Sequence, residues 1–406
     1  MARAHQRRRT RPCAPDRGSA ARGTGRGVGH GPTVVPRADT GRACHAFGMS
    51  RVLAVAPALP GPPRDQRAIT DIVAPIVAGA DDRRGALLRR VHRSSGVTTR
   101  HLALAPDEYA GVRDFGHAND LYLAIGTDLA ARAARDALDR AGVDPQDVDF
   151  VLFTSVTGIG APSVDAALVG LLGLRDDVTR LPSFGLGCGG GAAGLARVHD
   201  YLTGHPQDTA LLVCLELCSL TLQHGDADPA ALVANGLFGD GAAVAVVVGD
   251  AHPAAAGATG PRVVASRSRL YPGTEGDLGW RIGASGFRIV LSARLPDVVR
   301  AGLAPDVEGL LAAHGLKTGD VGRWVVHAGG PRILDAVEEA LSLPDGALDV
   351  SRASLSAVGN LSSASVLDVL DRTQRAGVPD GTPGVLLAFG PGVTAEVVLL
   401  RWSTAG

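Results

Sequence analysis

An apolar run, a glycine-rich turn and a series of small residues follow one another in Leu181-Pro182-Ser183-Phe184-Gly185-Leu186-Gly187-Cys188-Gly189-Gly190-Gly191-Ala192-Ala193-Gly194-Leu195. This order predicts a strand, a tight turn and a helix, with Cys188 at or near the helix N-terminus. Unpaired backbone N–H groups and aligned peptide dipoles place partial positive charge at that end. A thiol there is biased towards the nucleophilic thiolate, and glycines leave room for a bulky substrate. A buried cysteine with only a packing role is the alternative.

Strand and helix patterns alternate on both sides of this turn, which predicts an α/β fold. Residues 118–141 have the apolar periodicity of a long helix that ends at Gly142. A helix at residues 68–77 is expected to be broken by Pro75. The other predicted helices cover residues 83–93, 163–172, 332–341 and 365–370, and the other strands cover residues 51–55, 149–155, 209–214, 242–248, 323–327, 384–389 and 393–400.

The second half of the chain repeats the pattern of the first, and we infer an internal duplication. A shift of 172–173 residues places Cys188 on Asn360 and Thr154 on His327, each pair in a similar strand–turn–helix setting. Such halves pack face to face in a layered fold. The site is then expected between them, at the turns that close the strands.

A second correspondence has a different offset. A shift of 151 residues places Phe238-Gly239-Asp240-Gly241 on Phe389-Gly390-Pro391-Gly392, and a strand pattern follows each motif. We therefore expect an N-terminal half at residues 49–250, which carries the cysteine turn, and a C-terminal half at residues 251–406.

The composition is that of a globular protein, with 406 residues, 45% hydrophobic and 20% charged. Aromatic residues make up only 4%, which argues against a stacking platform for nucleic acid. Five cysteines without a CxxC spacing predict neither a disulfide framework nor a zinc site. The net charge of −1 divides unevenly, because residues 1–48 carry a net charge of +8 and the remainder −9, so the body is mildly acidic.

Residues 1–48 carry ten arginines and two aspartates without hydrophobic periodicity, and we expect them to be disordered. No apolar segment typical of a secretion signal follows Arg7-Arg8-Arg9, so we expect a cytoplasmic protein. A basic arm for an acidic partner is one alternative. The interpretation that we favour is that Met49, directly before a predicted strand, is the natural start.

Cys188, His327 and Asn360 form a coherent set for acyl transfer: a nucleophile, an imidazole and an amide that donates a hydrogen bond. Each has a simpler explanation. A lone histidine at a strand end is often a satisfied core or surface group, and Asn after Gly is favoured in turns. Cys214 and Cys218 lie on an apolar strand and are expected to be packing residues. The order Cys, His, Asn also suits a papain-like protease, but the signature of that family is absent.

Several motifs resemble those of the type III polyketide synthases, the chalcone synthase-like condensing enzymes of the thiolase fold. The resemblance runs from about residue 50 to Trp402. The related ketoacyl synthase III enzymes carry His-Gln-Ala-Asn at the position of His327 and are a secondary interpretation. The motifs are Gly187-Cys188, Leu237-Phe238-Gly239-Asp240-Gly241-Ala242-Ala243, His327-Ala328-Gly329-Gly330-Pro331-Arg332-Ile333-Leu334, Gly359-Asn360-Leu361-Ser362-Ser363-Ala364-Ser365 and Phe389-Gly390-Pro391-Gly392-Val393-Thr394.

The resemblance implies a homodimer of αβαβα subunits that uses CoA thioesters directly and needs no metal or redox cofactor. Cys188 then resembles the nucleophile that carries the acyl chain. His327 and Asn360 resemble the pair that binds the extender carbonyl and stabilises the enolate formed when malonyl-CoA loses CO2. A protonated His327 is also expected to hold the Cys188 thiolate.

The resemblance also assigns residues to the substrate cavity and to CoA. Phe238 matches an aromatic gatekeeper between the CoA tunnel and the cavity, and Ile289 aligns loosely with a second one. Trp280 falls near a position often held by glycine. Other cavity positions are matched by Thr157, Cys218, Thr221 and Ser362. The family's contacts to CoA phosphates match Arg90, with Arg89 and Arg93 beside it, although a solvated helix face explains these arginines equally well.

Residues 187–197 and 215–223 look most like the bacterial alkylpyrone and alkylresorcinol synthases. We therefore predict that an acyl-CoA starter is loaded on Cys188, extended with malonyl-CoA by decarboxylative Claisen condensation, and cyclised to an alkylpyrone or alkylresorcinol-type product. The neighbouring option is a tetrahydroxynaphthalene synthase, in which malonyl-CoA is also the starter. An inactive thiolase-fold binding protein is a third possibility, and the presence of all three reactive residues argues against it. We expect neither nucleic acid nor a membrane as a partner.

Overall fold

The computed structural model describes residues 48–79, 81–112, 114–226 and 228–402. Nine strands form a mixed sheet, and two short pairs lie outside it. In spatial order the sheet contains β11 (Arg323–Val326), β12 (Pro383–Gly390), β13 (Thr394–Trp402), β8 (Pro261–Leu270), β1 (Ser50–Ala58), β7 (Asp240–Gly249), β6 (Thr209–Leu217), β4 (Phe150–Ser155) and β5 (Thr179–Phe184). The short pairs are β2 (Arg64–Asp65) with β3 (Thr99–Arg100), and β9 (Leu278–Gly283) with β10 (Gly286–Leu291).

Ten α-helices accompany these strands in the described part of the chain. They are α1 (Gln66–Ala78), α2 (Asp82–Arg93), α3 (Phe115–Ala141), α4 (Val164–Leu172), α5 (Gly190–Gly204), α6 (Pro229–Leu237), α7 (Leu295–Ala312), α8 (Pro331–Leu341), α9 (Asp349–Val358) and α10 (Ser365–Arg375). The two helices in the centre follow short 3₁₀ turns, Gly187–Gly189 before α5 and Ser362–Ala364 before α10.

The strand order is the same in two parts of the sheet. In the first part, β4 and β6 are parallel, whereas β6, β7 and β1 are successively antiparallel. In the second part, β11 and β12 are parallel, whereas β12, β13 and β8 are successively antiparallel. The two parts join through the pairs Ser50–Val263 and Arg51–Arg262. This repetition confirms the predicted α/β fold from duplicated βα halves.

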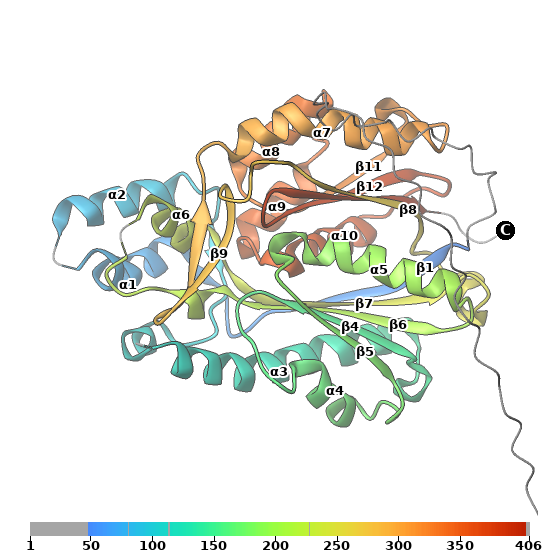
Figure 1. Ribbon diagram of the computed structural model, residues 1–406, viewed down its shortest axis with the longest axis horizontal. Coiled ribbons are helices and arrows are strands. Elements are labelled where there is room, and N and C mark those ends of the chain that lie inside the picture. Colours follow the sequence, from blue (N-terminus) through green and yellow to red (C-terminus); the bar gives the residue numbers. More distant parts are fainter. Residues whose placement is uncertain (1–47, 80, 113, 227, 403–406) are drawn as a thin grey trace, which may run out of the picture. The chain divides into compact units, whose positions relative to one another are not determined.

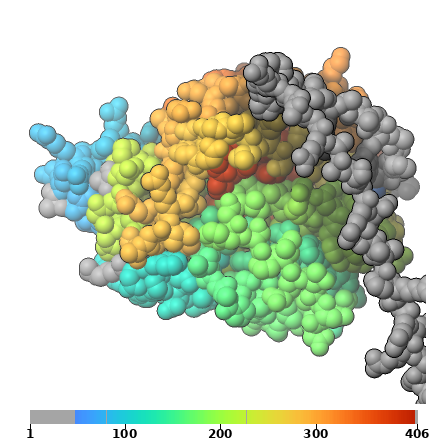
Figure 2. Space-filling model, viewed as in Figure 1, coloured from blue at the N-terminus to red at the C-terminus, as the bar shows by residue number. Residues whose placement is uncertain are grey.

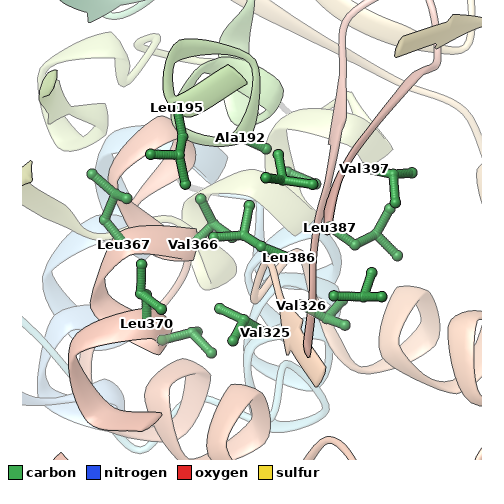
Figure 3. Packing of buried hydrophobic residues seen from close by; sticks show 14 of the residues in the cluster. Ala192, Leu195, Val325, Val326, Val366, Leu367, Leu370, Leu386, Leu387 and Val397 are labelled. Carbon is green, nitrogen blue, oxygen red and sulfur yellow. The ribbon is translucent and has the colours of Figure 1, made fainter. Parts of the chain in front are cut away.

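Helices and strands form five layers (Figure 1). Helices α3 and α4 cover the outer face of the β4–β7 part, α5 and α10 lie in the middle, and α7 and α8 cover the β11–β13 part. Apolar side chains of α5 and α10, such as Leu195 and Leu370, point towards Val325 and Leu386 of the second part (Figure 3). The central strands β6 and β7 are buried along their whole length, as strands covered on both faces require.

Small residues at the start of α5 allow this close packing. A Cβ on Gly191 would lie 2.4 Å from the carbonyl oxygen of Ser363, and one on Gly194 would lie 2.5 Å from Leu212. Both contacts are too short for real atoms, so the helix can approach β6 and the turn before α10 only with glycine at these positions. The sequence suggested that the glycines leave room for a substrate; in the structure they leave room for neighbouring elements.

Three local predictions were wrong. Pro75 lies inside α1 without ending it, because the helix continues to Ala78. Phe238 lies between α6 and β7, whereas Phe389 lies within β12, so the two phenylalanines are not equivalent although β7 and β13 are. The 3₁₀ turns before the central helices also place Cys188 level with Ser363 rather than with Asn360.

The predicted extension, residues 1–48, lies outside the described residues apart from Gly48. Met49 is the residue directly before β1, and its backbone N–H donates a hydrogen bond to the Asp250 carboxylate. Across the described ranges, no helix combines the length and the apolar character that a membrane crossing requires. The sequence patterns did not predict α6, α7, α9 or the strands β8 to β10.

Candidate active site

One cavity of about 410 Å³ brings Cys188, His327 and Asn360 together. Each residue is delivered by a different element: Cys188 by the turn before α5, His327 by the end of β11, and Asn360 by the loop after α9. Phe238 and Phe389 form further parts of the wall. The three residues that the sequence singled out are therefore neighbours, although up to 172 positions separate them along the chain.

Cys188 is partly exposed, and its thiol donates a hydrogen bond to Ser362 Oγ, 3.6 Å away. Burial raises the pKa of this thiol to about 12, and the nearby Glu216 carboxylate acts in the same direction. Hydrogen bonds with Ser362 and Asn360 lower the pKa but do not offset burial. Desolvation therefore opposes the thiolate that the helix end is expected to favour.

His327 directly follows β11, and its backbone N–H donates a hydrogen bond to the carbonyl of Leu387 at 2.8 Å. Burial lowers the pKa of the imidazole to about 4, so the ring is neutral near pH 7. Nδ1 has no hydrogen-bond partner among the residues that the structure describes. Burial therefore opposes the predicted imidazolium–thiolate pair at the imidazole as well as at the thiol, and the pair stays a prediction.

The side-chain amide of Asn360 is oriented by its own loop. Its Oδ1 accepts hydrogen bonds from Ser362 N at 2.8 Å and from Ser365 Oγ at 3.4 Å. Its Nδ2 donates a long hydrogen bond, 3.5 Å, to the carbonyl of Gly329 and also interacts with the Cys188 sulfur. Because the amide oxygen is occupied, the amide nitrogen is the group that remains to serve a ligand in the cavity.

Glu216, at the end of β6, is a buried carboxylate that the sequence analysis missed. It accepts hydrogen bonds from Ser363 Oγ at 2.6 Å, Thr157 Oγ1 at 2.8 Å and Val156 N at 3.1 Å. Burial raises its pKa to about 7. Glu216 is the only acidic residue in an otherwise apolar strand, and this was the signal that could have revealed it.

Two predicted cavity residues belong to this buried network. Ser362 Oγ donates a hydrogen bond to Glu216 Oε1 at 3.3 Å and accepts one from the thiol of Cys188. Thr157 is 4% exposed and bonds to Glu216 from the other side. Ser362 therefore links the Cys188 thiol to Glu216, and Thr157 binds the same carboxylate. Contact of either side chain with substrate stays a prediction.

Phe238 separates the main cavity from a small one of about 30 Å³. The small cavity is lined by the predicted residues Cys218, Thr221, Trp280 and Ile289. The ring centroids of Phe238 and Trp280 are 6.2 Å apart. Trp280 and Ile289 face each other across the β9–β10 pair, which explains why both reach Phe238. In Figure 2 this orange hairpin lies at the surface beside the yellow-green segment that contains α6.

The proposed CoA-binding arginines lie on α2. Arg89, Arg90 and Arg93 are exposed, and Arg89 forms a long ion pair of 3.7 Å with Asp71. The end of the same helix reaches the main cavity, whose wall includes Val91, Ser94 and Ser95. Arg332, at the start of α8, also lines the cavity and was not predicted. In the described part of the chain, no group of three or more His, Cys, Asp and Glu side chains could hold a metal ion.

Comparison with known proteins identifies the class that this fold and cavity define. The sequence pattern of the chalcone and stilbene synthases matches residues 38–253 with its N-terminal domain and residues 262–404 with its C-terminal domain. The chain belongs to this family and is a type III polyketide synthase, an acyl-transferring enzyme. The resemblance seen in the sequence is thereby confirmed, and the papain-like alternative is excluded.

Individual relatives narrow the comparison. The chain is 56% identical over 354 residues to 1,3,6,8-tetrahydroxynaphthalene synthase of Streptomyces peucetius subsp. caesius, which covers 86% of this chain and 93% of the relative. The crystal structure of the Streptomyces coelicolor enzyme of that name, a bacterial type III polyketide synthase, superposes with a TM-score of 0.81 at 34% identity and covers 87% of this chain and all of that one. An alpha-pyrone synthesis protein of Mycobacterium tuberculosis is 32% identical over 322 residues, 76% of this chain and 81% of the relative.

Proposed function

We propose that this enzyme uses malonyl-CoA both as starter and as extender and produces 1,3,6,8-tetrahydroxynaphthalene. The similarity to the Streptomyces peucetius enzyme supports this product, because it is much higher than the similarity to the alpha-pyrone relative. The proposal replaces our first prediction, an alkylpyrone or alkylresorcinol product, with the alternative that the sequence left open.

The narrow space beyond Phe238 is the structural observation that carries the proposal. The small cavity measures about 30 Å³, far less than the 410 Å³ of the main cavity. Trp280 lines the small cavity, and Phe287 packs on Trp280 with ring centroids 6.4 Å apart. A long acyl starter would have to displace these rings, whereas a malonyl group is short. The geometry therefore favours malonyl priming.

The cavity residues can perform the loading step. Neutral His327 accepts the proton of the Cys188 thiol, and the sulfur attacks the carbonyl carbon of malonyl-CoA. The carbon–sulfur bond to CoA then breaks, and the CoA thiolate takes the proton back from His327. The enzyme thioester forms with no net change in charge. Because the whole exchange uses CoA thioesters and side chains, we propose that no further cofactor takes part.

The extension step uses the same side chains in a different way. A second malonyl-CoA places its thioester oxygen near Asn360 Nδ2 and the His327 ring, both of which line the cavity. As CO2 leaves, the electron pair of the broken carbon–carbon bond forms an enolate, whose oxygen these groups stabilise by hydrogen bonds. The enolate carbon attacks the acyl carbon on Cys188, the Cys188 thiolate leaves, and the chain, longer by two carbons, is now a thioester of the second CoA. Before the next extension the Cys188 sulfur attacks that thioester, takes the chain back and releases CoA. Repetition and cyclisation would complete the product.

We also propose that the enzyme is a homodimer that pairs through the β5 edge. β5 is the last strand of the sheet, and Leu181 and Phe184 on it are 47% and 49% exposed. Ile159 and Leu171, on the neighbouring loop and on α4, are also exposed. A clustered apolar surface next to an unpaired strand edge is typical of a subunit interface.

Incubation of the purified protein with labelled malonyl-CoA alone tests the proposed function. We expect release of labelled CO2 and a product with the mass of 1,3,6,8-tetrahydroxynaphthalene, without any added acyl-CoA. A product that appears only after a fatty acyl-CoA is added would contradict malonyl priming and restore the alkylpyrone prediction. No CO2 release under either condition would contradict both.

Replacement of the nucleophile supplies the matched control. Cys188→Ala should abolish the acyl-enzyme and all condensation, while slow decarboxylation of malonyl-CoA remains through His327 and Asn360. Cys214→Ala removes a fully buried cysteine of β6 and should leave product formation intact. Product formation by the Cys188 variant would refute the assignment of the nucleophile.

A further inference from the structure

Arg100, on β3, is a buried cation next to the gatekeeper segment. Its side chain is almost fully enclosed, with the residue 3% exposed. Nη1 donates a hydrogen bond to the backbone carbonyl of Phe238 at 2.6 Å, and Nε donates one to Gln66 Oε1 at 2.8 Å. Burial lowers the pKa of the guanidinium to about 10, which still leaves it charged near pH 7. A charge is costly to bury without a purpose, so its partners indicate what it does.

Gln66, at the start of α1, binds a second backbone carbonyl, two residues before the one that Arg100 binds. Its Nε2 donates a hydrogen bond to the carbonyl of Gly236 at 2.6 Å. His92 packs closely against Gly236, since a Cβ at this glycine would lie 2.3 Å from the imidazole Cδ2. Arg100 and Gln66 are also bonded to each other, so they act on the end of α6 as one unit. We call this pair the α6 clamp.

The Leu237 carbonyl lies between the carbonyls of Gly236 and Phe238, and it accepts a hydrogen bond from the loop that carries Asn360. Asn360 N donates to the carbonyl of Leu237 at 2.8 Å, and Gly239 N donates to the carbonyl of Asn360 at 2.9 Å. Gly359 brings the loop close, because a Cβ there would lie 2.8 Å from the Leu237 carbonyl oxygen and 3.1 Å from Arg100 Cδ. Three consecutive carbonyls, at positions 236 to 238, are thus bound by Gln66, by Asn360 and by Arg100 in turn.

The placement agrees with the electrostatics of a helix end. The last carbonyls of a helix lack partners within the helix and carry partial negative charge. A guanidinium at the end of α6 satisfies one of them and is itself stabilised there. The fan-shaped donors of arginine can bind two acceptors at fixed angles, which a lysine ammonium cannot reproduce. The α6 clamp therefore fixes the orientation of the backbone at the end of α6 as well as its distance from β3.

We propose that Arg100, acting with Gln66, is a positioning residue that sets the Phe238 ring and the Asn360 amide in one fixed arrangement. The inference rests on the proposed function, in which Phe238 gates the cavity and Asn360 binds the extender carbonyl. Arg100 acts through the backbone of residues 236 to 239 and does not touch the substrate. If the clamp loosens, the donor and the gate lose their alignment together, so extension slows and the chain is released early.

The test compares Arg100→Met, Arg100→Lys and Arg51→Met with the full-length wild type. Arg51 is a matched control, because it is 1% exposed and donates hydrogen bonds to the carbonyls of Ala258 and Gly260, away from the cavity. For Arg100→Met we expect kcat for malonyl-CoA decarboxylation to fall by about 10- to 100-fold, as small misplacements of catalytic groups do. The KM for malonyl-CoA should change by less than about threefold, because CoA contacts lie elsewhere.

The product distribution separates positioning from folding. We expect Arg100→Met to release mainly shorter lactones, Arg100→Lys to restore part of the full-length product, and Arg51→Met to lower only the melting temperature. Wild-type product ratios and kcat in folded Arg100→Met would overturn the inference. Should that variant not fold, Gln66→Leu decides, because it frees the Gly236 carbonyl and keeps the guanidinium. An inactive wild type would instead refute the proposed function.

Discussion

The reactive side chains of this enzyme lie in surroundings that keep them neutral. Burial raises the pKa of the Cys188 thiol and lowers that of the His327 imidazole, so the two move away from an ion pair. A proton transfer between them must therefore accompany substrate binding or attack. Behind the thiol, Ser362 and Glu216 form a buried chain of hydrogen bonds whose charge also depends on pH. Two predictions at the scale of single residues follow from these pKa directions.

Alkylation of Cys188 should report its neutral resting state. With a pKa of about 12, the thiolate fraction is small and grows about tenfold per pH unit. We expect the iodoacetamide rate at Cys188, measured by peptide mass spectrometry, to rise steadily between about pH 7 and pH 9. Cys214 should stay unlabelled and so report on folding. A rate that reaches a plateau by about pH 8 would instead indicate a thiolate stabilised in the resting enzyme.

Glu216 should make stability depend on pH. Its pKa is raised from 4.5 to about 7 by burial, so the folded protein prefers the protonated acid. This contribution is fully present below pH 4.5 and is lost as the pH rises through about 7. Relative to Glu216→Gln, which cannot ionise, the wild type should lose about 3 kcal/mol of unfolding free energy between about pH 5 and pH 8. Urea denaturation of both proteins at each pH measures the difference in unfolding free energy. A difference that does not change with pH would show that Glu216 does not titrate with the raised pKa.

At the scale of elements, the β9–β10 hairpin shapes the space beside the cavity, and the edge strand β5 presents an apolar surface. The hairpin places Trp280 and Ile289 directly opposite each other, so a short element controls the space behind Phe238. The edge strand exposes apolar side chains where the sheet ends. We propose that neither element takes part in the chemistry itself, that the hairpin limits the size of the starter, and that the edge strand forms the subunit interface.

Trp280→Ala should widen the choice of starter. Removal of the indole opens space beyond Phe238, and each additional methylene that finds apolar space gains roughly 1 kcal/mol. We expect turnover of medium-chain acyl-CoA starters to rise at least about tenfold relative to malonyl priming, measured by product mass in competition assays. Ile282→Ala changes an exposed residue of the same strand and should leave starter preference unchanged. Unaltered preference in the Trp280 variant would show that the indole does not limit the starter.

Leu181→Asp should disrupt the proposed dimer. A carboxylate at a buried apolar interface is costly to desolvate, so the subunits should separate. We expect sedimentation to give the monomer mass for this variant and the dimer mass for the wild type. Leu87→Asp introduces the same charge at a similarly exposed leucine on α2 and should not change the mass. A monomeric wild type, or a Leu181 variant of unchanged mass, would exclude pairing through β5.

At the scale of the whole molecule, the two duplicated halves meet through helices α5 and α10, whose preceding turns build the site. The nucleophile turn belongs to one half, whereas Ser362, Asn360 and His327 belong to the other. Catalysis therefore depends on how closely the halves pack. Gly191 lies at a tight contact between them, against Ser363 and Val366.

Gly191→Ala should separate the halves and weaken both stability and activity. Its new methyl group would collide with the Ser363 carbonyl and Val366, and overpacking of this kind costs about 1–3 kcal/mol. Gly204→Ala is the control in the same helix, since nothing lies within 4 Å of its Cβ, and it should change stability by less than about 0.5 kcal/mol. Urea denaturation distinguishes the two. Equal stability of both variants would show that the contact can relax without cost.

Much of the site could be predicted because its signals are local or repeated. The strand–turn–helix around Cys188, the turn of Asn360 and the strand before His327 each have a recognisable pattern, and the duplication and the family motifs connect them. Glu216, Gln66 and Arg100 escaped prediction because their partners lie far away in the chain. Gln66 and Gly236, for example, are separated by 170 residues.

The sequence by itself determined the α/β alternation, the duplicated halves, the family and the three reactive residues, because these depend on local periodicity and on motif spacing. Only the tertiary structure decided that the glycines after Cys188 serve helix packing, that Trp280 lines the small cavity beside Phe238, and that burial favours the neutral thiol and the neutral imidazole. The physical reason is that burial and contact arise from segments distant in sequence. Desolvation depends on what surrounds a group in space, and no single stretch of chain specifies that.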